Sequence, residues 1–176
     1  PEDIELRSAL STAYFNSENY DEALNHALCV IELDEKDPQA YCNLGSCYSA
    51  QNMVDEAVES FKKASEIDPD YSLPHTNLGS LYATIGRIEK AIKEFKLATS
   101  MNQSDSLAWM NLYSCYKEVG RMEDAQEAFR KYESLMNQGS QGENQTNIPG
   151  GVSQTGQLAS GENMDTASPG MEELTS

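Results

Sequence analysis

From residue 137 to residue 176 the chain contains no lysine, no arginine and no aromatic side chain. All twelve basic residues of the 176-residue sequence therefore precede that segment, and of the formal net charge of −17 the segment carries −5. Phosphate binding requires clustered lysine and arginine, so this acidic chain is not expected to bind nucleic acid. The same charge disfavours binding to anionic membrane surfaces.

The chain also lacks an apolar run of about 18 residues, so no membrane-inserted helix is expected. It has no basic-then-apolar leader, although it begins with proline rather than methionine, so a removed signal stays open. The four cysteines include no pair at metal-ligand spacing, and we predict no metal site. Unpaired cysteines favour a reducing, cytoplasmic compartment, while a secreted or periplasmic location remains open.

Recognisable catalytic patterns are absent as well. The sequence has two histidines, His26 and His75, and no nucleophile elbow, phosphate loop or zinc-protease motif. His75 occupies a position that holds a packing aromatic elsewhere in the chain, so we interpret it as structural. The sequence therefore predicts a protein that is not an enzyme and has no cofactor.

What the sequence does contain is a 34-residue period. The segment DPQAYCNLGSCYSAQNMVDEAVESFKKASEIDP, which begins at Asp37, recurs in related form from residue 70 and from residue 104. Leucine, tyrosine, alanine and phenylalanine return in the same order each time. The recurring sets are Leu44, Leu78 and Leu112; Tyr48, Tyr82 and Tyr116; Ala57, Ala91 and Ala125; and Phe61, Phe95 and Phe129. An earlier copy is weaker, because Arg7 fills its aromatic position and Ala27 its phenylalanine position.

This pattern resembles the tetratricopeptide repeat, with its aromatic, Leu-Gly, Tyr, Ala, Phe, Ala and Pro signature, over about residues 4–136. Tyr113 departs from it by replacing the glycine of the earlier copies. The resemblance implies an all-α fold, a right-handed α-solenoid of about four helix-turn-helix repeats with a concave groove. The expected domains are a repeat domain at 1–136, with repeats at about 4–37, 38–71, 72–105 and 106–136, and a low-complexity acidic tail at 137–176. The tail is rich in Gly, Ser, Gln, Asn and Thr, a composition that predicts disorder in isolation.

Within each repeat the apolar residues recur at three- and four-residue steps, which predicts two amphipathic helices. The predicted helices lie near 3–16, 20–33, 38–51, 54–67, 72–85, 88–101, 106–119 and 122–136. Gly45 and Gly79 are expected to let the paired helix approach, with Ala57 and Ala91 as the facing residues. A left-handed residue is useful at the turn inside each hairpin. The expected turn residues are Asn52, Gly86 and Gly120.

In the family that the chain resembles, the first helix of each repeat lines the groove, where partners lie as extended peptides. Asn43, Asn77 and Asn111 occur once per repeat in this helix and resemble the asparagine ladder of peptide-binding arrays. An asparagine amide offers one donor group and one acceptor, which matches a peptide unit of any sequence. Ser46, Ser80 and Ser114 are predicted on the same face. Asparagine also occurs at this position without a ladder role, so a purely structural role remains the alternative.

Another groove type in this family clamps the acidic C-termini of chaperones with lysine and arginine. The matching positions here hold Ser8, Leu73 and Asn77, and of the clamp only Asn43 is present. An uncharged groove favours an extended backbone over an acidic tail. We therefore predict a scaffold that binds a protein or peptide partner, whose identity the sequence does not specify.

The alternative function is a self-assembling structural subunit, a homo-oligomer whose repeats stack or exchange C-terminal tails. No further helix is predicted to cover the last one, so its apolar residues are candidates for end-to-end packing. These residues are Met122, Phe129, Tyr132 and Leu135. Gln126 and Arg7 act against stacking, since each places a polar side chain where other repeats have an apolar one. Two asparagines, Asn102 and Asn144, also match the glycosylation acceptor pattern.

Overall fold

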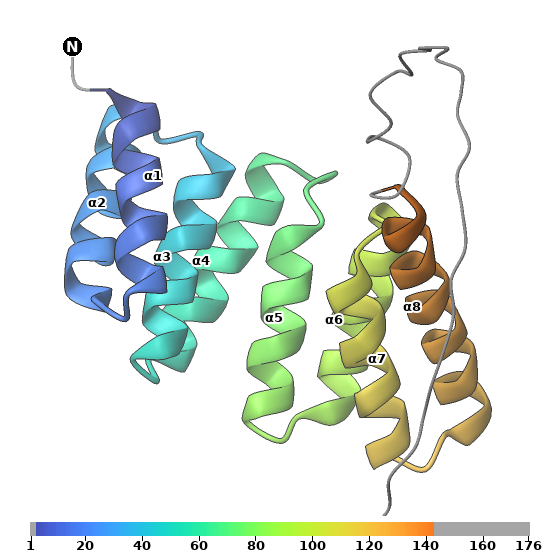
Figure 1. The fold of residues 1–176 in the computed structure, drawn as a ribbon. Helices are drawn as coiled ribbons and strands as arrows, with labels where there is room; N and C mark the ends of the chain where they lie inside the picture. Colours follow the sequence, from blue (N-terminus) through green and yellow to red (C-terminus); the bar gives the residue numbers. More distant parts are fainter. Residues whose placement is uncertain (1–2, 143–176) are drawn as a thin grey trace, which may run out of the picture.

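The computed structural model describes residues 3–142, which form eight α-helices joined in antiparallel pairs (Figure 1). The helices are α1 (Ile4–Asn16), α2 (Tyr20–Leu33), α3 (Pro38–Ala50), α4 (Val54–Ile67), α5 (Leu73–Thr84), α6 (Ile88–Met101), α7 (Ser106–Glu118) and α8 (Met122–Gly142). Their number and order confirm the all-α prediction. The last helix continues to Gly142 rather than ending near 136, because no glycine or proline interrupts it before Gly139. Most of the predicted tail, residues 143–176, lies outside the described residues.

Aspartate side chains begin three of the four odd-numbered helices. Asp3, Asp37 and Asp105 each stand at the N-cap and accept a hydrogen bond from a backbone N–H of the first turn. Asp37 accepts two such bonds, from the N–H groups of Gln39 at 2.8 Å and Ala40 at 3.2 Å. These caps satisfy donors that have no partner within the helix, and so they set where each repeat starts.

The turn inside every hairpin contains one residue in the left-handed region. These residues recur at the 34-residue period, with φ values of 61° at Glu18, 61° at Asn52, 73° at Gly86 and 75° at Gly120. The predicted left-handed backbone at Asn52, Gly86 and Gly120 is therefore confirmed. Glu18 holds the same conformation in the weaker first repeat, where no glycine or asparagine indicates it.

A phenylalanine ring lies against a glycine in each of the two central hairpins. A Cβ atom placed on Gly45 would lie 2.7 Å from the ring of Phe61, and one on Gly79 would lie 2.7 Å from the ring of Phe95. Both rings are almost completely buried, with 1% and 0% of their surface exposed. The glycines therefore permit the close approach that the sequence predicts, but they face phenylalanine rings and not the alanines that we expected.

The last hairpin has a tyrosine where the others have this glycine. The rings of Tyr113 and Phe129 lie side by side with their centroids 5.0 Å apart, and Tyr132 follows at 6.1 Å from Phe129. Phe129 is only half-buried, in contrast to its counterparts in the central hairpins. A ring on α7 thus keeps Phe129 from entering the space between the paired helices.

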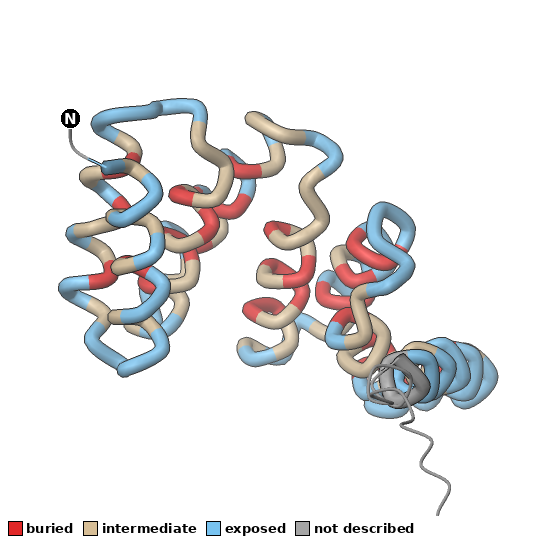
Figure 2. Tube along the Cα trace, turned by 45° about the horizontal axis from the view of Figure 1, so that its top comes forward, coloured by how far each residue is buried: buried red, intermediate tan, exposed pale blue. Residues whose placement is uncertain are grey.

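Each hairpin packs on the next one through its second helix, so the four hairpins form a solenoid, and one buried apolar cluster runs through the second, third and fourth hairpins. Figure 2 shows the buried residues on the sides of the helices that face one another. The core includes Cys42 and Cys47, and burial raises the pKa of these thiols to about 12 and about 11. Both therefore remain uncharged at neutral pH. Across residues 3–142 no helix is long and apolar enough to cross a membrane.

We predict that Gly79→Ala destabilises the solenoid. Forcing one methyl group into a filled site costs roughly 1–3 kcal/mol, which exceeds the ~1 kcal/mol of helix propensity that alanine adds. Urea unfolding followed by circular dichroism measures the effect. In a Phe95→Leu background, which removes the ring, the cost of Gly79→Ala should shrink. A Gly79→Ala variant at least as stable as the wild type would contradict the contact.

Candidate peptide-binding groove

The odd-numbered helices form the inner side of the solenoid. Direct contacts join α1 to α3, α3 to α5 and α5 to α7, whereas within the described residues the even-numbered helices do not contact one another. The helices that contact one another lie on the inside of the curve, so α2, α4, α6 and α8 lie on its outer side. The predicted groove residues all lie on α3, α5 and α7.

The three predicted serines bind their own helices. Each hydroxyl donates to the carbonyl oxygen four residues earlier, which leaves the serine oxygen free to accept a hydrogen bond from outside. The bonds run from Ser46 to Cys42 at 2.9 Å, from Ser80 to Thr76 at 3.0 Å and from Ser114 to Met110 at 3.1 Å. This row therefore offers hydrogen-bond acceptors to a ligand.

Asn43 differs from the other two predicted asparagines because its amide is part of an internal chain of hydrogen bonds. Its Oδ1 accepts from Nε2 of Gln39 at 2.9 Å, and Oε1 of Gln39 in turn accepts from the hydroxyl of Tyr71. The Nδ2 of Asn43 is buried and has no hydrogen-bond partner within residues 3–142. The geometry thus commits Asn43 to the contact between α3 and the loop before α5.

Asn77 and Asn111 are half-buried, and neither side chain makes a hydrogen bond within the described part of the chain. Each lines a separate shallow hollow on the inner side. The hollow beside Asn77 has a volume of about 240 Å³ and includes Ser46, Ser80 and the ring of Phe61. The hollow beside Asn111 has a volume of about 230 Å³ and is lined by the counterparts of these residues one repeat later. Those residues are Ser80, Ser114 and the ring of Phe95.

The two hollows adjoin, because Ser80 and Thr84 line both of them. Glu118 is the one charged residue in their combined lining. Each hollow therefore pairs an asparagine amide with an acceptor hydroxyl above a buried aromatic ring. Five of the six predicted groove residues meet here, and Asn43 does not.

Asp105 holds the two helices that carry Asn77 and Asn111 in register. Its Oδ1 accepts from the N–H of Ala108 at 2.9 Å and caps α7, while its Oδ2 accepts from the hydroxyl of Thr76 on α5 at 2.8 Å. Thr76 is only 2% exposed, so this bond is a buried link between successive repeats. We did not predict this role of Asp105 from the sequence. Two signals indicated it: Asp105 directly precedes a predicted helix, and Thr76 is a polar residue at a core position.

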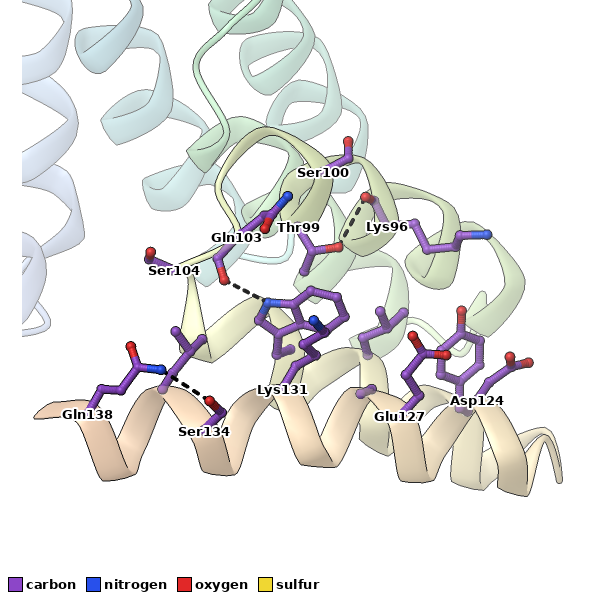
Figure 3. Close-up of a pocket in the computed structure, with 15 residues that line it drawn as sticks. Lys96, Thr99, Ser100, Gln103, Ser104, Asp124, Glu127, Lys131, Ser134 and Gln138 are labelled. Carbon is purple, nitrogen blue, oxygen red and sulfur yellow. Dashed lines mark hydrogen bonds between the residues drawn. The ribbon is translucent and has the colours of Figure 1, made fainter.

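A larger hollow lies on the outer side between α6 and α8, with a volume of about 620 Å³ (Figure 3). We call it the outer crevice. Trp109, Leu112 and Tyr116 of α7 line it, and the indole N–H of Trp109 donates to the carbonyl of Gln103 at 3.0 Å. None of the predicted groove residues lines it.

A similar crevice of about 600 Å³ lies two repeats earlier, beside Tyr41, Leu44 and Tyr48. At the corresponding place in the third hairpin, Nδ1 of His75 lies 2.9 Å from Oε2 of Glu94. Both side chains are mostly buried, so His75 has the structural role that the sequence predicts.

Two family models, both described as tetratricopeptide repeat, match residues 38–71 and 60–93. The first match spans α3 and α4, and the second runs from within α4 to within α6. The chain is a tetratricopeptide repeat protein. No curated protein matches the sequence.

Solved structures share the fold of this tetratricopeptide repeat protein. MamA aligns at a TM-score of 0.69 with 20% identity, over 80% of this chain and 82% of that chain. A thermophilic TPR protein of Thermus thermophilus aligns at 0.69 with 20% identity, over 82% of this chain and 78% of that chain. PilF of Pseudomonas aeruginosa aligns at 0.70 with 20% identity, over 75% of this chain and 60% of that chain. At this level of identity the likeness shows the fold alone.

The four residues expected to pack end to end lie along α8 in different surroundings, and their role stays a prediction. Met122 is 55% exposed, Phe129 lies between Tyr113 and Tyr132 in ring contact with both, and Leu135 lines the outer crevice. The buried Ile92 and Thr99 of α6 correspond to the exposed Gln126 and Glu133 of α8. Of the two glycosylation-type asparagines, Asn102 is exposed at the end of α6 and Asn144 lies outside the described residues.

We predict that Asp105→Ala costs more stability than Asp3→Ala, a matched N-cap that makes no bond to another repeat. Both variants lose a cap worth about 1 kcal/mol, but Asp105→Ala also leaves the buried Thr76 hydroxyl without its partner, which adds roughly 1–3 kcal/mol. Urea unfolding compares the two. Thr76→Val should cost less than Asp105→Ala, since it removes the hydroxyl itself. Equal losses for the two aspartate variants would contradict the link.

Proposed function

We propose that the protein is a non-catalytic interaction scaffold that binds an extended, largely uncharged peptide segment along α3, α5 and α7. The observation that carries the proposal is the pair of adjoining hollows in which Asn77 and Asn111 have no internal hydrogen-bond partner among the described residues. A half-buried amide without a partner gains the most from a ligand that supplies one, because its solvation is already reduced.

The chemistry of the two hollows selects an extended backbone. The amides of Asn77 and Asn111 offer N–H donors and carbonyl acceptors, and the serines beside them accept from ligand N–H groups. A peptide backbone alternates these same groups along its length. The rings of Phe61 and Phe95 lie buried beneath the hollows, and the accessible apolar lining comes from Phe15, Ala50 and Ala83, which fit apolar side chains of the ligand. Since Glu118 is the single charge in the lining, charged ligand side chains would gain no complementary partner there.

The scaffold interpretation also agrees with the absence of a continuous apolar face at the end of α8 within the described residues. Stacking of copies requires such a face. The exposed Gln126 and Glu133 occupy positions that are buried in α6, so α8 presents polar side chains where the next repeat would pack. We therefore propose peptide binding ahead of self-assembly through the ends.

Panning the full chain against a phage-displayed library of random peptides tests the proposal. We expect enriched peptides to be uncharged and extended, and a synthetic copy of one to bind by isothermal calorimetry. Asn77→Ala with Asn111→Ala should weaken that binding about tenfold or more, since each net hydrogen bond contributes roughly 0.5–1.5 kcal/mol.

Asn43→Ala is the matched control, because the Asn43 amide already bonds to Gln39. Asn43→Ala should change the affinity by less than about threefold, which is no more than the loss of one weak hydrogen bond would cause. Circular dichroism establishes that each variant keeps its helices. Equal affinity of the double variant and the wild type would remove Asn77 and Asn111 from the site, and failure to enrich any peptide would count against a peptide-binding role.

A further inference from the structure

The outer crevice has a lining that the inner groove does not share. Its walls are α6 and α8, and Figure 3 shows Glu127 and Lys131 rising from α8 toward α6. Trp109, Leu112 and Tyr116 of α7, together with Leu135, give it an apolar part. The outer crevice is thus amphipathic, and it lies on the side of the molecule opposite to the proposed peptide site.

The charges of the crevice are unevenly neutralised. Asp124 is paired with Arg121, whose guanidinium Nη2 lies 2.7 Å from its Oδ2. Lys96 on the α6 wall and Lys131 on the α8 wall form no ion pair within residues 3–142, and Glu127 is the remaining unpaired acid. The four charged residues of the lining sum to zero, but Arg121 beside the crevice neutralises Asp124, so two lysines face a single free carboxylate, although the protein as a whole carries −17.

The earlier crevice beside Tyr41 provides a contrast. Its lining contains Glu56, Glu59, Glu66, Lys62 and Lys63, with Lys63 already 3.7 Å from Glu66. Acids outnumber lysines there, so an acidic segment would be repelled. Of these two hollows, the one between α6 and α8 is the one suited to an acidic, partly apolar ligand.

The chain itself contains such a segment, beyond the end of α8, the helix that forms one wall of the crevice. Residues 143–176 follow directly from α8, and the sequence Met171-Glu172-Glu173-Leu174 places two adjacent acids between two apolar residues. The residues that separate it from Gly142 can span roughly 90 Å when extended, at about 3.3 Å per residue. The 21-residue α8 measures only about 31 Å at 1.5 Å per residue, so the segment reaches every part of the crevice.

We propose that residues 171–174 bind in the outer crevice of their own chain. In an extended segment successive side chains project to opposite sides, so Glu172 and Glu173 point to opposite walls. Lys96 and Lys131 stand on these opposite walls. By the same alternation Met171 shares a side with Glu173 and Leu174 shares a side with Glu172, so each wall receives one acid and one apolar side chain beside Trp109, Leu112 and Leu135. Because the segment is tethered, its effective concentration at the crevice is on the order of millimolar, and a weak contact is sufficient to fill the site.

Trp109 is the single tryptophan of the chain and reports on the crevice directly. Quenching of its fluorescence by acrylamide, a neutral molecule that charge changes do not attract, measures how accessible the crevice is. In the full chain, Glu172→Lys with Glu173→Lys should raise the Stern–Volmer constant about twofold, because repulsion empties a site that the tether otherwise keeps occupied. Met171→Ser with Leu174→Ser should raise it as well.

Glu162→Lys with Asp165→Lys is the matched control, since it changes the net charge of the tail by the same amount at another place. It should leave the constant at the wild-type value. Lys96→Glu with Lys131→Glu should raise the constant, and adding Glu172→Lys and Glu173→Lys to that variant should restore protection. A merely structural effect of the lysine variants would not be rescued in this way.

Raising the salt concentration from about 0.1 M to about 1 M shortens the Debye length from ~10 Å to ~3 Å, so it should weaken protection in the wild type. Equal quenching in the wild type and all tail variants would overturn the proposal. Protection that increases with protein concentration, together with a dimer mass by light scattering, would assign the crevice to the tail of a second copy and overturn the intramolecular form. These outcomes do not depend on whether the inner groove binds peptides.

Discussion

The close contact between a phenylalanine ring and a helix backbone without a side chain organises this solenoid. Phe61 and Phe95 lie within 2.7 Å of the place where a Cβ on Gly45 or Gly79 would stand, and their burial ties the two helices of each central hairpin together. The same rings lie beneath the inner hollows. One contact therefore determines the spacing of the paired helices under the proposed binding surface. In the last hairpin Tyr113 prevents it, and Phe129 stays half-buried.

Much of this fold follows from the 34-residue period, because a helix hairpin that recurs with its turn residues intact repeats its geometry. The helix boundaries and the left-handed turns were predictable for that reason. The partner of the glycines was not, since Ala57 and Phe61 lie on the same face of α4 and periodicity alone does not rank them. The length of α8 was missed because the family pattern ends before the helical propensity of the sequence does.

The positions of the candidate site were predictable from the sequence, but the differences among its three asparagines were not. Asn43, Asn77 and Asn111 are equivalent in the repeat pattern, yet among the described residues only the Asn43 amide accepts an internal hydrogen bond, from Gln39, which in turn accepts one from Tyr71. This difference depends on Gln39 and Tyr71, which do not recur at the equivalent positions of the other repeats. The link from Asp105 to Thr76 and the unpaired lysines of the outer crevice arise in the same way. Such contacts join neighbouring repeats, and they appear only when the repeats are placed together in space.

The two surfaces of the array thus differ in chemistry. The inner one is nearly uncharged and offers amide and hydroxyl groups to a backbone, whereas the outer crevice combines an apolar lining with two lysines. The central claim is that the inner surface holds an extended peptide at Asn77 and Asn111. Nuclear magnetic resonance of the full chain, with a bound library-derived peptide, tests it most directly. We predict that the side-chain amide signals of Asn77 and Asn111 shift most and show contacts to the peptide backbone, while that of Asn43 stays nearly unchanged. Shifts confined to the Trp109 indole and to α6 and α8 would contradict the account.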